Sequence, residues 1–321
     1  MKRILSEKGR KTGLLSFEWV MIVYAFLTSI FILFAWQKLD DPSALLLKRF
    51  VPVVITLMLG IIGKKYEFKL IGILRILFQL YMLVWWYPDT YELNKAIPNL
   101  DHLFASAEQW IFGCQPALTF CTSYPQPFIS EAMSFGYFVY YPLIVYTAFY
   151  YFVKRKEEIE KVMFIIMGSF FAYYLIFDFL PVVGPTFYYK AVGLERIGEG
   201  VFPAMGDYFT THTDCMTTPG YTDGVFYQLV EGAKAAGERP TAAFPSSHVG
   251  IATICMLLLY RLKNKTSFLL FIIPYILLSM ATVYIQAHYV IDAIAGLITG
   301  IVFYYLFMKW SKSTFILSPE F

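Results

Sequence analysis

Residues 239–248 read Arg-Pro-Thr-Ala-Ala-Phe-Pro-Ser-Ser-His, and residues 288–292 read His-Tyr-Val-Ile-Asp. Between the two motifs lie two apolar runs, each long enough to form a helix across a membrane. A hairpin of two such helices returns the chain to its starting surface, so His248 and His288 are expected on the same face. We therefore predict a site at one lipid–water boundary that combines two imidazoles with the carboxylate of Asp292. These groups are suited to phosphoryl transfer.

The composition is that of a membrane protein. Hydrophobic residues account for 58% of the 321 residues and charged residues for 15%, whereas a soluble domain has about 25% charged residues. The formal net charge of +3 is too small to indicate binding to nucleic acid. We predict an all-α polytopic membrane protein without a separate soluble domain.

Eight apolar runs predict about eight transmembrane helices. The run at residues 50–62 is the weakest, because a span needs about 17–25 residues. The first run is too long for a signal peptide and lacks a cleavage site after it, so it is expected to be retained. The runs are Phe17–Trp36, Phe50–Ile62, Leu70–Trp86, Ser134–Val153, Val162–Leu180, Phe244–Leu262, Phe268–Ile285 and Tyr289–Lys309.

Lysine and arginine residues in the short loops indicate the orientation. A basic cluster between Lys2 and Lys11 precedes the first run, and further clusters recur in alternate loops, as expected if both termini are cytoplasmic. Arg75 lies close enough to a cytoplasmic end to extend its charge to the surface. Short tails favour a bacterial inner membrane. We predict an integral membrane protein with its active site on the periplasmic or lumenal face.

The runs divide the chain into two parts. Residues 1–69 are predicted to form an N-terminal membrane hairpin. Residues 70–321 are predicted to form a six-helix catalytic membrane domain with two outer-face loops, at 87–131 and 181–243. Within the first loop, Asp101–Trp110 is expected to form a short helix on the membrane surface.

The spacing of the second motif indicates its chemistry. Asp292 lies four residues after His288 at the start of a predicted helix, which places both side chains on one face. A carboxylate bonded to one ring nitrogen fixes the tautomer and leaves the other nitrogen free to attack phosphorus. We expect His288 to form a phosphohistidine intermediate. His248 follows a helix-start pattern and is expected to protonate the leaving alcohol, then to deprotonate the incoming hydroxyl.

The substrate phosphate needs hydrogen-bond donors and positive charge. The helix start at Ser246 and Ser247 offers free backbone N–H groups, which commonly bind anions. Arg239 is the best candidate for the charge because a guanidinium matches phosphate geometry, and Lys190 is a weaker one. No metal or other cofactor is expected, because the nucleophile and its carboxylate would be two ligands with no third in view.

Each of these residues has a simpler explanation when it is taken alone. A single histidine at the end of a span is more often an interfacial polar residue, and a Ser-Ser pair is usually a helix cap. Both histidines together with a carboxylate inside a span favour a site, since intramembrane carboxylates are costly and usually functional or paired. His102 and His212 lack such partners and are interpreted as loop residues. An oxidising compartment would permit a disulfide within Cys114, Cys121 and Cys215, with the pairing open.

The two motifs carry a family resemblance. Phe244-Pro-Ser-Ser-His248 resembles the Pro-Ser-x-His element of the type-2 phosphatidic acid phosphatase superfamily. His288-Tyr-Val-Ile-Asp292, followed by Gly296, resembles the His-x-x-x-Asp element of that superfamily. The resemblance implies a six-helix membrane bundle, here the last six predicted spans. It also implies that His288 is the nucleophile, Asp292 its support and His248 the acid.

Other stretches are similar to one branch of the superfamily. Lys234 is too close to Arg239 for the Lys-x6-Arg-Pro element of the phosphatases, and no arginine directly precedes His288. Phe112-Gly-Cys-Gln-Pro116 and Leu180-Pro-Val-Val-Gly-Pro185 loosely resemble the inositol phosphorylceramide synthase and sphingomyelin synthase branch. That resemblance implies transfer of a phosphoinositol-type headgroup from a phospholipid donor to a lipid-alcohol acceptor such as ceramide.

Two alternatives stay open at this point. A lipid phosphate phosphatase of the phosphatidate or polyprenyl diphosphate type would use the same residues, with water as the acceptor. A proton-coupled transporter would use His288 and Asp292 as a relay, although the chain shows no inverted repeat.

Overall fold

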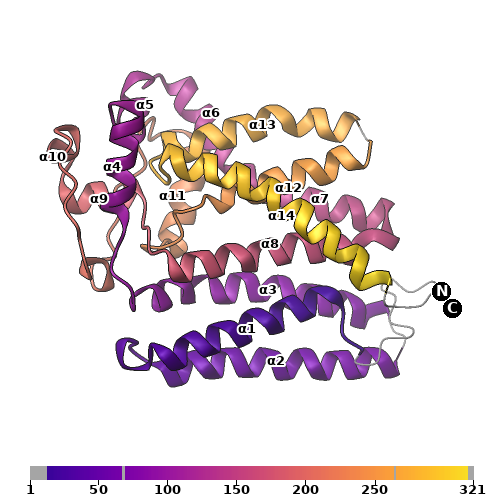
Figure 1. The fold of residues 1–321 in the computed structure, drawn as a ribbon. Helices are drawn as coiled ribbons and strands as arrows, with labels where there is room; N and C mark the ends of the chain where they lie inside the picture. Colours follow the sequence, from indigo (N-terminus) through magenta and orange to yellow (C-terminus); the bar gives the residue numbers. More distant parts are fainter. Residues whose placement is uncertain (1–12, 67–68, 264, 317–321) are drawn as a thin grey trace.

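The computed structural model describes residues 13–66, 69–263 and 265–316, and the basic cluster between Lys2 and Lys11 lies outside them. The described residues form helices and no strands, which confirms the all-α prediction (Figure 1). Seven helical segments of this described part are long and apolar enough to cross a membrane, and a shorter apolar helix, α12, accompanies them. The total agrees with the predicted number of about eight.

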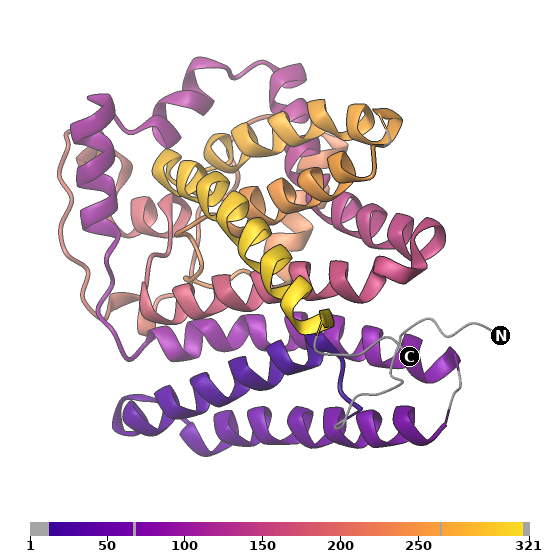
Figure 2. The same ribbon diagram turned by 45° about the vertical axis from the view of Figure 1, so that its right-hand side comes forward.

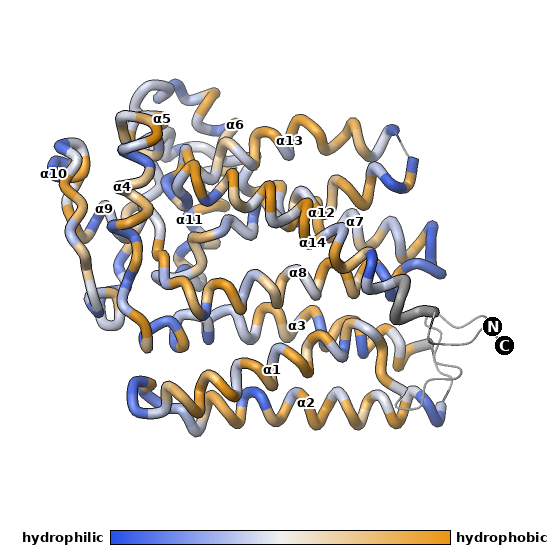
Figure 3. The backbone as a smooth tube through the Cα atoms, in the orientation of Figure 1, coloured by the Kyte–Doolittle hydropathy of each residue, from blue (hydrophilic) through white to orange (hydrophobic). Residues whose placement is uncertain are grey.

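The apolar helices lie side by side as a bundle (Figures 1 and 2), and hydrophilic residues gather mainly near the ends of the helices (Figure 3). The run predicted at Ser134–Val153 is built from two helices, α6 and α7, which together make one span. The bundle consists of α1 (Ser16–Phe34), α2 (Pro42–Lys65), α3 (Lys69–Asn94), α6 (Pro127–Phe138), α7 (Tyr140–Lys154), α8 (Ile159–Phe179), α12 (Ser247–Arg261), α13 (Lys265–Tyr284) and α14 (Val290–Ile316).

The weakest predicted span, at residues 50–62, is the middle of a full-length helix. Helix α2 begins eight residues before this run because Asp41 caps it, accepting a 2.9 Å hydrogen bond from the Ala44 N–H, and Pro42 occupies its first turn. The charged pair Lys48 and Arg49 separates Leu45–Leu47 from the longer apolar run, which is why the sequence underestimated the length of α2.

The segments between the spans form a helical cover over one end of the bundle. Helix α3 continues to Asn94, beyond the predicted end at Trp86. Of the helices in the cover, α4, α5, α9 and α10 gather at the end of the bundle opposite the C-terminal end of α14 (Figure 1). The cover contains α4 (Asp101–Phe112), α5 (Pro116–Ser123), α9 (Pro185–Val192), α10 (Leu194–Gly198) and α11 (Val225–Gly237).

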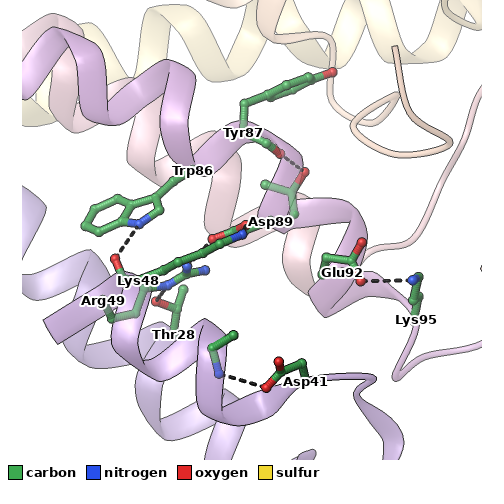
Figure 4. A network of polar contacts seen from close by, with 11 residues as sticks. Thr28, Asp41, Lys48, Arg49, Trp86, Tyr87, Asp89, Glu92 and Lys95 are labelled. Carbon is green, nitrogen blue, oxygen red and sulfur yellow. Dashed lines mark hydrogen bonds and ion pairs between the residues drawn. The ribbon is translucent and has the colours of Figure 1, made fainter. Parts of the chain in front are cut away.

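Buried charges attach the two N-terminal helices to the rest of the bundle. Arg49 of α2 forms an ion pair with Asp89 of α3, and its Nε donates to the Thr28 hydroxyl of α1 at 3.1 Å (Figure 4). The Lys48 amine reaches the same carboxylate at 2.9 Å. Arg49 and Asp89 are each 1% exposed, so each charge depends on its partner for stability inside the bundle.

A second buried pair corrects a prediction. Arg75 does not extend its charge to the cytoplasmic surface, because its guanidinium is fully buried and pairs with Glu18 of α1. It also donates to the Gly13 carbonyl at 2.8 Å. Periodicity cannot reveal this pair, because 57 residues separate the two charges along the chain.

Candidate active site

The structure brings the two histidines of the opening motifs together under the helical cover. His248 lies in the first turn of α12, and His288 lies in the turn between α13 and α14. The His288 Nε2 is 3.4 Å from the His248 Nδ1, and the ring centroids are 5.6 Å apart. A hairpin of α12 and α13 therefore returns the chain to the same end of the bundle.

A backbone carbonyl fixes the His288 ring. The Nδ1 of His288 lies 2.8 Å from the Ala243 carbonyl oxygen, and the backbone N–H of His288 donates to the Thr282 carbonyl at 3.0 Å. A carbonyl can only accept, so Nδ1 carries the proton and Nε2 presents its lone pair toward His248. Burial lowers the pKa of His288 from 6.5 to about 4, which keeps the imidazole neutral and nucleophilic near pH 7.

Asp292 is close to His288 but is not the direct partner of its ring. The Oδ2 of Asp292 lies 3.7 Å from the His288 Nδ1 and accepts a 2.8 Å bond from the Tyr289 N–H. The expected one-face geometry needs both residues on a helix, whereas α14 begins only at Val290. Asp292 therefore caps the start of its own helix. From 3.7 Å its carboxylate can still stabilise positive charge that develops on the His288 ring.

His248 lies against aromatic rings of α6 and α7. Its ring stacks on Tyr137 with centroids 4.8 Å apart and contacts Tyr140 at 4.5 Å. Ser246 accepts a 3.4 Å bond from the Val249 N–H, so it is the cap of α12. His248 is only partly buried, which leaves one edge of its ring open to a substrate.

Small residues set the distance between α12 and α14. A Cβ on Gly296 would lie 2.4 Å from the Ser246 carbonyl oxygen, and one on Gly300 would lie 2.6 Å from the Gly250 carbonyl oxygen. Small residues four apart on both helices allow backbones to approach closely in a membrane. The Ser246 N–H also donates to the Asp292 carbonyl at 2.9 Å. This contact places His248 against the helix that follows His288.

The predicted phosphate-binding cations have other surroundings. The Lys190 amine donates to the Cys215 carbonyl at 3.0 Å. Arg239 is exposed. Ser247, at the start of α12, is buried beside Ser246. The backbone N–H groups of Ser247 and His248 lie in the first turn of α12 and have no acceptor within the helix.

Three acidic residues near the histidines were missed from the sequence. The Glu238 carboxylate opposes the larger effect of burial, which lowers the pKa of His288. Burial also raises the pKa of the Glu238 carboxyl itself. Asp101 and Glu108 of α4 are fully buried, and the Oε1 of Glu108 accepts a 3.1 Å bond from the Ile291 N–H. Burial raises the pKa of Glu108 to about 7. The spacing of seven between Asp101 and Glu108 puts both on one helix face, a signal that could have found them.

The described residues show neither a disulfide bond nor a cluster of metal ligands. Cys114, Cys121 and Cys215 are unpaired, and the Sγ of Cys121 lies 3.6 Å from the Nε2 of Gln286. Within the same described ranges, no group of three His, Cys, Asp or Glu side chains could hold a metal ion.

Comparison with known proteins gives one match. A family model described as the PAP2 superfamily matches residues 102–306, which is more than half of the chain and includes both histidines and Asp292. No curated protein and no solved structure matches.

Proposed function

Because the chain belongs to the PAP2 superfamily, which places it among lipid enzymes of the phosphatase and phosphotransferase type, we propose that it transfers a phospho-headgroup between lipids. The donor is a glycerophospholipid with a phosphoinositol-type headgroup, and the acceptor is a lipid hydroxyl such as that of ceramide. The active site faces the periplasmic or lumenal side of a membrane, with a bacterial inner membrane as the proposed location.

One observation carries the proposal. The Nε2 of His288 has a free lone pair because Nδ1 is bound to the Ala243 carbonyl, and this lone pair faces His248 at 3.4 Å. A phosphate bound beside the two rings would have a nucleophile in His288 and a proton donor in His248 within reach.

The reaction then proceeds in two balanced steps. The neutral His288 Nε2 attacks phosphorus, the bond to the diacylglycerol oxygen breaks, and protonated His248 gives its proton to that oxygen. Neutral His248 next takes the proton from the acceptor hydroxyl, the new oxygen attacks phosphorus, and His288 leaves as neutral imidazole. The negative charge of the bound phosphodiester favours the protonated form of His248 in the first step.

Backbone N–H groups at the start of α12 are the proposed hydrogen-bond donors to the phosphoryl oxygens. The N–H groups of Ser247 and His248 at the start of α12 have no acceptor within the helix and suit a phosphate oxygen. Removing one such donor from a preorganised site typically costs 10²–10³-fold in rate, that is about 2.7–4 kcal/mol.

The segment Leu180–Pro185, which resembles the synthase branch, is our reason for proposing a transferase rather than a hydrolase. A Cβ on Gly184 would lie 2.6 Å from the Ala287 carbonyl, so this segment packs directly behind His288. The Ala243 N–H donates to the Val182 carbonyl at 3.0 Å, which joins the same segment to the carbonyl that holds the nucleophile. The stretch that resembles the synthase branch is thus part of the site.

The test uses purified protein in vesicles with headgroup-labelled phosphatidylinositol and a short-chain fluorescent ceramide. The expected result is a new lipid that carries both labels, formed with one equivalent of diacylglycerol. Release of the labelled headgroup into water without the new lipid would reject the transferase and support a hydrolase. The His288→Asn variant is expected to form neither product.

A further inference from the structure

Asp101 is a buried carboxylate that accepts hydrogen bonds from four donors. Its Oδ2 accepts from the Val183 N–H and from the Asn99 amide, each at 2.7 Å. Its Oδ1 accepts from the Gly184 N–H at 2.9 Å and from the Tyr289 hydroxyl at 3.0 Å. Asp101 itself is 0% exposed. Such complete satisfaction of a buried carboxylate joins three parts of the chain that are distant in sequence.

We propose that Asp101 is a positioning residue that holds the ring of His288 in its attacking orientation. The inference rests on the proposed function in assigning His288 as the nucleophile. Asp101 does not touch the reacting atoms, and it acts on the ring through two separate routes.

The first route passes through Tyr289, the residue directly after the nucleophile. Its hydroxyl donates to Asp101, and its backbone N–H donates to the Asp292 carboxylate at 2.8 Å. Its ring lies against Phe104 and Tyr189, with centroids 6.4 and 6.2 Å away, and the side chain is fully buried. Both ends of Tyr289 are therefore fixed, and the adjoining backbone of His288 is fixed with them.

The second route passes through the carbonyl that binds the ring. Asp101 holds the N–H groups of Val183 and Gly184, and the neighbouring Val182 carbonyl accepts a 3.0 Å bond from the Ala243 N–H. The carbonyl of Ala243 in turn accepts from the His288 Nδ1 at 2.8 Å. The tautomer and the tilt of the nucleophile thus depend on a segment that Asp101 anchors.

The chemistry of the four donors requires a carboxylate. Both oxygens of aspartate accept, whereas asparagine would present an NH₂ group in place of one oxygen and would oppose the donors on that side. The variant Tyr289→Phe removes only the hydrogen bond from the Tyr289 hydroxyl to Asp101, because it keeps the ring.

The experiment compares Tyr289→Phe and Asp101→Asn with Tyr188→Phe as a matched control. Tyr188 is also fully buried in the same cluster, but its hydroxyl donates to the Pro203 carbonyl at 2.8 Å rather than to Asp101. The full chain in detergent is treated with diethyl pyrocarbonate, and modification of His288 is followed by mass spectrometry. Headgroup transfer from phosphatidylinositol to fluorescent ceramide is measured in parallel.

Tyr289→Phe is expected to lower kcat about tenfold while KM stays within about twofold, because the lost bond orients the ring and does not bind lipid. His288, which is 3% exposed in the intact site, is expected to be modified faster in Tyr289→Phe and faster still in Asp101→Asn. Tyr188→Phe is expected to match the wild-type protein in both measurements.

Wild-type modification of His288 in Tyr289→Phe would overturn the proposal, and so would an equal change in Tyr188→Phe. Tyr289→Phe keeps the test decisive if Asp101→Asn does not fold. If the wild-type protein transfers no headgroup, the proposed function fails in that assay, while the modification rates still decide whether Asp101 positions the ring.

Discussion

The close contact between α12 and α14 predicts that Gly296→Ala impairs catalysis more than it impairs folding. The added Cβ would lie 2.4 Å from the Ser246 carbonyl oxygen, whereas ordinary contact begins at 3.4 Å, so the helices must part by 3.4 − 2.4 = 1.0 Å. The obstructing atom belongs to the backbone and cannot rotate away. Overpacking of this kind costs about 1–3 kcal/mol of stability.

The same displacement moves His248 relative to His288, because Ser246 and His248 begin the same helix. A misplacement of about 1 Å in a catalytic group can lower a rate by 10²-fold. We therefore expect kcat for headgroup transfer to fall about a hundredfold in Gly296→Ala, with an SDS-unfolding free energy lower by about 1–3 kcal/mol.

Gly232→Ala is the matched control, since its added Cβ would meet nothing within 4 Å. Gly232 lies within α11, where alanine is favoured over glycine by about 1 kcal/mol. The control is expected to keep wild-type activity and equal or higher stability. Wild-type kcat and stability in Gly296→Ala would refute the packing that we describe.

Two further predictions concern charge. Burial lowers the pKa of His288 from 6.5 to about 4, so the imidazole stays neutral as the pH falls through 6.5 and is protonated only near pH 4. His288 should therefore remain a competent nucleophile at pH 5.5, and the pre-steady-state rate of diacylglycerol release should not fall because of its protonation. A loss of half this rate at pH 6.5 would contradict the prediction. Asp89→Asn leaves the buried Arg49 without its ion-pair partner and should lower the free energy of SDS unfolding by about 3–5 kcal/mol. The double variant Arg49→Met, Asp89→Leu removes both charges and should lower it by less. Equal losses in the two variants would argue against a buried ion pair.

Local patterns in the sequence were sufficient for the helical class and for the meeting of the histidines. The length of the apolar runs identified the spans. Two consecutive spans return the chain to the side on which it started, and this predicted that His248 and His288 lie at one end of the bundle. Both inferences depend on residues close together in the chain or on the bilayer itself. The family match over residues 102–306 covers the two histidine motifs but not the first three predicted spans.

Contacts between distant segments were not predictable in this way. The Ala243 carbonyl that holds the His288 ring is a backbone atom, so no side-chain pattern marks it. The pairing of Arg75 with Glu18 joins two helices, and a single sequence does not reveal which charges meet. The hydrogen bond from Lys190 to the Cys215 carbonyl likewise joins two segments that no local pattern pairs.

The central claim is that one imidazole carries the headgroup between two lipids, and chemical trapping tests it most directly. Purified protein is mixed with phospholipid labelled in its phosphate, quenched in alkali within the first turnover, and mapped by mass spectrometry. We expect acid-labile label on the peptide that contains His288, lost on addition of acceptor lipid and absent from His288→Asn. Turnover at the normal rate with the label on another residue, or in the His288→Asn variant, would contradict the account.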